Sequence, residues 1–188
     1  ANTLPPHDLS GVGEQVIQLA AGLRECGCDV RILGRGPEGA RGPKALFPVA
    51  VVAPCRRALA SFRPDVVQVH ESDGALAALL VRWTRRGARG PLLVALQQVS
   101  YREERAAVRP LVHQGRVLGA PGAVERRFRW LKAPVQVLLG RLSARLADLV
   151  LAPSRATAAE LERDYGARRV GVLPNVTGGL PVEPVFLP

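Results

Sequence analysis

Segments with helical periodicity alternate along the chain with short apolar runs. The first helical segment follows Gly11 and is predicted to end near Gly27. Its apolar positions recur at intervals of one to four residues that keep to one face of a helix, at Val12, Val16, Leu19, Ala20 and Leu23. Further helices are predicted over 54–62, 74–86, 122–147 and 154–165, the third of them bent near Pro134.

Short β-branched or apolar runs bounded by turn residues predict buried parallel strands. They lie at 29–33, 46–52, 66–70, 91–96, 149–151 and 170–173. A central first strand should precede Gly11, and only residues 1–4 remain of it. The alternation predicts an α/β fold, a Rossmann-like parallel sheet with helices on both faces and a truncated first strand. We expect one domain over 1–174 and a Pro/Gly-rich linker or tail over 175–188.

Composition narrows the class of protein. The chain has 188 residues, of which 47% are hydrophobic, so it can build a core and is not disordered. No 18-residue apolar run is free of charge, and no signal peptide is visible near residue 1. Three cysteines are no disulfide framework and fit a reducing cytoplasm. Cys26 and Cys28 lack a second ligand pair, so no metal site is predicted.

The formal charge of +10 comes almost wholly from arginine. It favours anionic partners, although an Arg- and Ala-rich chain also reflects a GC-rich genome. Six of the 26 basic residues lie in the predicted helix 122–147, beside aromatic and leucine side chains. This helix either lies on an anionic membrane surface or packs its apolar stripe on the sheet. Its membrane-facing candidates are Arg126, Arg127, Arg129, Trp130 and Lys132. Nucleic acid is not expected as a partner.

Ligands of an open parallel sheet bind at the carboxyl ends of its strands, so the loops there hold the candidate chemistry. Gly11, Val12 and Gly13 open a helix and can bring backbone N–H groups to a phosphate, or simply form a tight turn. The cleft candidates are His7, His70, Glu71, Gln97, Gln98, Tyr101, Ser154 and Arg155. Ser154 is also a plain helix cap, and His70 with Glu71 also a simple strand end.

The motifs in this order resemble the N-terminal domain of family 4 retaining glycosyltransferases of GT-B fold. SGVGEQVIQLAAGLRECGCDVRIL is similar to the family opening GGVGxHVxxLAxxLxxxGHxVxV, and PDVVQVHE is similar to PDVVHxHx. PLLVALQQ, RLADLVLAPSRATAAELERDYG and RRVGVLPNV resemble the next three stretches. The resemblance covers about residues 3–177.

The resemblance implies an acceptor-binding domain that faces a donor-binding C-terminal domain, which this chain lacks. It implies sugar transfer from a nucleotide sugar to an unknown acceptor, without a metal or other cofactor. The glycine loop Gly11–Gly13 would approach the donor phosphates. Gln97 stands where the family has a histidine near the transferred sugar. The complete protein would be a hexosyltransferase-like enzyme, and this fragment alone would be inactive.

Two other readings of the chain stay open. It could be a standalone, non-catalytic Rossmann-like binding module, or a peripheral membrane adaptor at the inner face of the membrane. The sequence contains no methionine, and we expect its natural start to lie upstream.

Overall fold

The computed structural model describes residues 11–36, 39–85, 90–113 and 116–175. Four parallel strands in the order β1-β2-β5-β6 form its main sheet. They are β1 (Val66–His70), β2 (Leu92–Leu96), β5 (Leu149–Ala152) and β6 (Val170–Val172). Four predicted strands are therefore confirmed, and so is the Rossmann-like α/β class. The truncated first strand, and all of the predicted linker or tail 175–188 except Asn175, lie outside the described residues.

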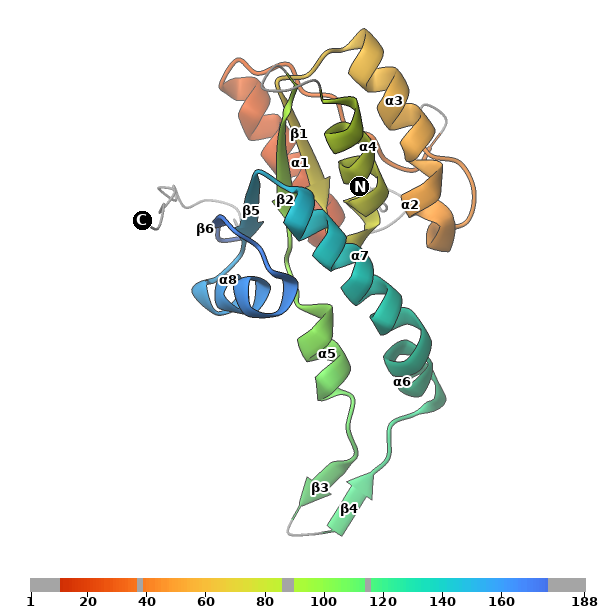
Figure 1. Cartoon of the computed structure of the whole chain (residues 1–188). Helices are drawn as coiled ribbons and strands as arrows, with labels where there is room; N and C mark the ends of the chain where they lie inside the picture. Colours follow the sequence, from red (N-terminus) through yellow and green to blue (C-terminus); the bar gives the residue numbers. More distant parts are fainter. Residues whose placement is uncertain (1–10, 37–38, 86–89, 114–115, 176–188) are drawn as a thin grey trace.

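Each crossover between neighbouring strands carries a helix. These helices are α4 (Ala75–Thr84), α7 (Ala133–Leu146) and α8 (Arg155–Glu160). All three crossovers run in one direction across the sheet, and right-handed crossovers therefore place these helices on one face. Helix α1 (Gly11–Glu25) lies behind the strands in Figure 1, so helices cover both faces.

The core forms where α4 and α7 pack on the sheet. Leu93, Ala95 and Val150 point from the strands toward Val81 of α4 and Ala144 of α7, and all five side chains are buried. Gly140 lets α7 approach closely, since a Cβ there would lie 2.6 Å from the ring of Tyr165. The missing side chain at Gly140 therefore allows α7 to pack closely against the turn that follows α8.

Helix α1 ends as predicted. Gly27 has φ 82°, the Gly27 N–H donates to the Arg24 carbonyl, and the Cys28 N–H donates to the Leu23 carbonyl. This is the Schellman arrangement, which favours glycine in the left-handed position.

Two strand predictions are wrong. Residues 46–52 form the end of a 3-10 turn (Lys44–Leu46), helix α2 (Phe47–Ala50) and the start of α3 (Val52–Ser61). Phe47, Val51 and Cys55 are buried at intervals of four residues, so the buried positions recur with the period of a helix. Residues 29–33 form no strand, and none of them pairs with the four-stranded sheet.

The predicted helix 122–147 consists of α6 (Ala123–Arg127), a π-helical turn (Phe128–Lys132) and α7. The Ala133 N–H donates to the Phe128 carbonyl five residues back. Pro134 follows at once and has no N–H to give, which explains the wider turn at this point.

Residues 98–120 hold α5 (Tyr101–Ala107) and a hairpin of β3 (Leu111–His113) and β4 (Arg116–Gly119). Figure 1 shows this hairpin projecting beyond the sheet, below α5 and α6.

Candidate functional site

The carboxyl ends of the four strands meet at one edge of the sheet. The loops that follow them begin at Glu71, Gln97, Pro153 and Leu173. Because the strands are parallel, these loops gather on the side where open α/β sheets bind their ligands.

Glu71 follows β1 and is the most strained position of this edge. Its backbone has φ 53° and ψ −162°, a conformation that costs a non-glycine residue about 1–3 kcal/mol. The side chain is buried, and its Oε1 accepts a 2.6 Å hydrogen bond from the Gln98 N–H. Its Oε2 is buried and has no partner among the described residues. Strain and an unmet buried oxygen together make Glu71 a candidate functional residue.

Burial raises the pKa of Glu71 to about 8. The Gln98 N–H opposes this rise, while the carboxylates of Asp73 and Glu104 add to it. At neutral pH the group is therefore mostly the neutral acid, which can donate a hydrogen bond as well as accept one.

Gln97 ends β2 and is completely buried. Its backbone N–H donates 2.9 Å to the Leu151 carbonyl, which fixes the residue between β2 and β5. Neither Oε1 nor Nε2 of the side chain has a partner within the described part of the chain. Leaving the oxygen and the nitrogen of a buried amide without hydrogen-bond partners costs free energy, so a ligand or an ordered water is the expected partner.

Gln98 connects the site to helix α1. Its Nε2 donates to Oε1 of Gln15, and Nε2 of Gln15 donates 2.7 Å to Oδ1 of Asn175. Segments far apart in the sequence are thereby joined at the carboxyl edge. The sequence analysis missed Gln15, although its place in the first turn after the glycine loop pointed to this edge.

His70 is the last residue of β1, and its Nε2 lies 3.0 Å from Nε2 of Gln68. Burial lowers the pKa of His70 to about 4, so the ring is neutral at neutral pH. A neutral imidazole can contact a hydroxyl ligand without adding charge to the site.

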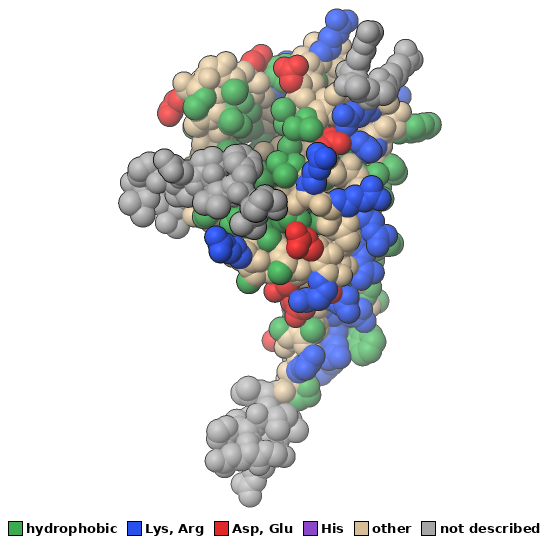
Figure 2. All heavy atoms as spheres, turned by 60° about the vertical axis from the view of Figure 1, so that its left-hand side comes forward, with side chains coloured by type: hydrophobic (Ala, Val, Ile, Leu, Met, Phe, Trp, Pro, Cys, Tyr) green, Lys and Arg blue, Asp and Glu red, His purple; other side chains and the backbone are tan. Residues whose placement is uncertain are grey.

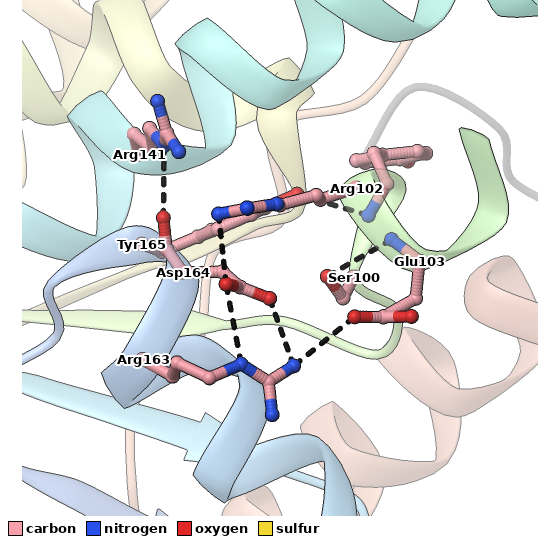
Figure 3. A network of polar contacts seen from close by, with 8 residues as sticks. Ser100, Arg102, Glu103, Arg141, Arg163, Asp164 and Tyr165 are labelled. Atoms are coloured by element: carbon pink, nitrogen blue, oxygen red, sulfur yellow. Dashed lines mark hydrogen bonds and ion pairs between the residues drawn. The ribbon is translucent and has the colours of Figure 1, made fainter. Parts of the chain in front are cut away.

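Tyr101 begins α5 and connects the site to a polar network (Figure 3). Its backbone N–H donates 2.9 Å to the hydroxyl of Tyr165, whose ring is buried. Burial raises the pKa of Tyr101, with the Glu71 carboxylate adding to the rise. The phenol therefore stays protonated and can act as a hydrogen-bond donor.

Asp164 is the centre of that network. It accepts from Arg102 at 2.9 Å and from Arg163 at 3.0 Å, and its carbonyl accepts from Nε of Arg141 at 2.9 Å (Figure 3). The Arg163 hydrogen bond is the largest cause of a lowered pKa at Asp164. This network holds α5 against α7 and the end of the α8 segment, and so positions the loop that carries Gln97.

The glycine loop occupies the first turn of α1. Gly11 is the first residue of the helix, Val12 is half-buried and Gly13 is buried. Helix N-termini carry free N–H groups and partial positive charge, which suits a phosphate. His7 lies outside the described residues.

Ser154 and Arg155 take a structural position. The Ser154 Oγ accepts a 3.1 Å hydrogen bond from the Thr157 N–H, so the residue caps α8. Both residues are exposed at the carboxyl edge.

The basic helix places its predicted membrane-facing residues unequally. Arg126, Arg127, Trp130 and Lys132 are exposed. Arg129 is half-buried, and its guanidinium donates 2.7 Å to the Val108 carbonyl, which connects it to the segment after α5.

The described residues hold neither a metal-binding cluster nor a membrane-spanning helix. They contain no group of three or more His, Cys, Asp or Glu side chains that could hold a metal ion. Within the same ranges, no helix has the length and apolar character to cross a membrane.

Comparison with known protein families gives a match over most of the chain. Residues 9–177 match the model of Glycosyltransferase Family 4. The matched range includes the glycine loop, Glu71, Gln97 and the network around Asp164. No curated protein matches the chain.

Proposed function

The chain belongs to glycosyltransferase family 4, and we propose that it forms the acceptor-binding, N-terminal half of a retaining glycosyltransferase. The donor is a nucleotide sugar, and the acceptor is a hydroxyl of a lipid, a glycan or a small molecule. In this proposal a second domain completes a GT-B fold and holds most of the donor. The enzyme works in the cytoplasm, at or near the inner face of the membrane.

The observation that carries this proposal is the buried amide of Gln97 at the carboxyl edge of the sheet, which has no partner among the described residues. An amide offers one acceptor and two donors, and a sugar hydroxyl can satisfy both kinds of group. Beside it, Oε2 of Glu71 offers a further buried and unpartnered oxygen. Such a set suits a neutral, hydroxyl-rich ligand better than a charged or apolar one.

The proposed transfer needs no protein nucleophile. The acceptor hydroxyl forms a new C–O bond at the anomeric carbon, on the face from which the nucleotide phosphate departs. The bond between that carbon and the phosphate oxygen breaks, and the hydroxyl proton passes to the departing phosphate. The positive end of the α1 dipole, at the glycine loop Gly11–Gly13, stabilises the negative charge that develops on the phosphate. We expect the reaction to need no metal ion.

The other residues of the edge bind and orient the acceptor. Neutral His70 and the neutral acid form of Glu71 add no net charge at pH 7. Tyr101 supplies a phenol, and Gln98 keeps α1 attached to the site. A site of this kind binds by directed hydrogen bonds, so it rejects ligands that leave those groups unpaired.

The test measures nucleotide release from UDP-glucose, UDP-N-acetylglucosamine and GDP-mannose by the complete natural protein, with a mixture of glycan and lipid acceptors. Gln97→Leu removes the amide and keeps the size of the side chain. Losing hydrogen bonds to a substrate hydroxyl predicts a fall in kcat/KM of about 10- to 100-fold. Gly13→Val blocks the approach of the phosphate and should lower turnover as well.

Gln18→Leu is the matched control, because this glutamine is exposed on α1 and contacts Glu14 within the helix. It should keep the wild-type rate. A normal rate for Gln97→Leu would exclude the assigned role of the amide. Binding of glycans with no nucleotide release from any donor would favour the non-catalytic binding module.

A further inference from the structure

An exposed apolar face runs along the helical segment from α6 to α7. Leu131, Val135 and Leu138 follow one another at intervals of four and three residues, which puts them on one side of the helix. Their exposed fractions are 64%, 56% and 67%. Trp130 and Val124, on the same segment, are 64% and 82% exposed. Side chains of this size are expensive to leave in water over a continuous stretch.

Helix α4 extends the same face. It packs directly beside α7 (Figure 1), and its buried residues turn toward the sheet. Leu79 and Trp83, one turn apart on its outer side, are 44% and 87% exposed. Two neighbouring helices therefore present leucine, valine and tryptophan outward on the side away from the sheet.

Cationic side chains flank this apolar face. The segment 123–146 has six basic residues and one acidic residue, Glu125. The Glu125 carboxylate accepts from the Gly122 N–H at the start of α6, so it is committed to the helix end. Arg127, Lys132 and Arg145 are exposed. Figure 2 shows a column of blue side chains down one edge of the molecule, with green ones among them.

We propose that the face formed by Leu131, Val135, Leu138, Leu79 and Trp83, with Arg127, Lys132 and Arg145 at its border, docks on an anionic lipid surface. Apolar side chains enter the boundary between headgroups and acyl chains, and guanidinium and ammonium groups meet the lipid phosphates. Exposed tryptophan suits this boundary, because its ring is apolar and its N–H polar. The nearly unopposed positive charge favours lipid phosphate over a second copy of this basic chain, which would bring like charges together.

The helical segment that carries the docking face is connected to the candidate site through α5. Arg129, within the π-helical turn, donates to the Val108 carbonyl just after α5, and α5 begins at Tyr101 beside the site. A docked membrane would therefore lie close to the carboxyl edge of the sheet. A further step rests on the proposed function: an acceptor carried on a lipid could enter the site from that surface.

The experiment is co-sedimentation of the 188-residue chain with vesicles, without any nucleotide sugar. One vesicle is equimolar phosphatidylglycerol and phosphatidylcholine, and the other is phosphatidylcholine alone. We expect binding to the anionic vesicle that weakens as salt rises. Because no donor is present, a failure here would not bear on sugar transfer, and an inactive transferase would not bear on docking.

Two sets of variants test the two parts of the face. Arg127→Gln with Lys132→Gln should weaken binding about 30-fold, from about 1 kcal/mol for each charge near an anionic surface. Val135→Ser with Leu138→Ser should weaken it by at least about tenfold, and this loss should persist when salt is raised. All four side chains are exposed and none belongs to the buried core, so circular dichroism should show an unchanged fold.

Arg168→Gln with Arg169→Gln is the matched control, because it removes the same number of positive charges. These exposed residues precede β6, at the opposite edge of the sheet. They should keep binding within about threefold of the wild type, since charges beyond a Debye length are screened. If the control pair Arg168 and Arg169 lost as much vesicle binding as the pair Arg127 and Lys132, the proposal would be overturned. Equal binding to both vesicles would also overturn it. If the serine variant lost self-association but kept vesicle binding, the face would be assigned to a second copy of the chain, and the proposal would fail.

Discussion

Replacing Glu71 with glutamine removes a carboxyl group whose ionisation the fold opposes. Burial raises the pKa of Glu71 from an ordinary value near 4.5 to about 8. Each pKa unit corresponds to about 1.4 kcal/mol, so the folded state disfavours the ionised form by roughly 5 kcal/mol. Glutamine keeps an oxygen that can accept from the Gln98 N–H, and it does not ionise.

The sign of the effect follows from which state holds the proton. Below about pH 4.5 both states are protonated, and the full stability is present. As pH rises toward 8 the unfolded chain releases the proton and the folded chain keeps it, so stability falls. Above pH 8 the loss is complete and the curve is flat again.

The contribution of His70 to the pH dependence of stability has the opposite sign and must be separated from that of Glu71. Burial lowers its pKa from 6.5 to about 4, so its stabilising contribution is lost as pH falls through that range and is constant above about pH 6.5. Between pH 6.5 and 8 the slope therefore belongs to Glu71, and the wild type should lose about 2 kcal/mol there. Glu71→Gln should be nearly flat over the same interval.

The assay is urea unfolding followed by circular dichroism at pH 6.5, 7.25 and 8. Glu162→Gln, at an exposed position after α8, is the matched control and should keep the wild-type slope. A wild type with level stability between pH 6.5 and 8 would refute the reasoning, as would a Glu71→Gln protein that keeps the slope.

Two further predictions concern the scaffold. Gly140→Ala puts a Cβ 2.6 Å from the ring of Tyr165, so we expect a loss of about 1–3 kcal/mol in thermal unfolding. Gly22→Ala has no neighbour within 4 Å and should stabilise α1 by roughly 0.5–1 kcal/mol; equal effects of the two substitutions would contradict the packing argument. Asp148→Asn weakens the contacts with Arg85 at 2.7 Å and Arg82 at 3.1 Å, and we expect a cost of about 1–2 kcal/mol at pH 7. Burial alone would raise the pKa of Asp148, but the Leu93 N–H and Arg85 outweigh it and lower the pKa. The difference in free energy of unfolding between wild type and variant should therefore disappear in acid, as the carboxylate is protonated.

Local patterns were enough for most of the elements. The runs 66–70 and 149–151 are β-branched or apolar and bounded by turn residues, and both are strands. The wrong strand at 46–52 shows the limit of that reasoning. A short apolar run satisfies strand and helix alike, and only the burial of Phe47 and Val51 on one side decides for the helix.

The location of the candidate site could be predicted from the sequence, but the contacts within it could not. Glu71 and Gln97 could be named because each follows a strand of a parallel sheet. The sequence could not show that one oxygen of Glu71 accepts from the Gln98 N–H while the other is unpartnered. It gave no sign that Asp164 joins Arg102, because these two residues meet only after α5 and the α8 segment pack together.

The sequence by itself determined the alternation of strands and helices, the end of α1 at Gly27, the cap at Ser154 and the family to which the chain belongs. These depend on residues near one another in the chain, where dihedral preferences and the spacing of apolar side chains act directly. Tertiary structure alone decided the strand order, the strained burial of Glu71 and which side of α7 faces outward. Each of these is a contact between segments distant in sequence, and its energy exists only once the sheet has assembled around it.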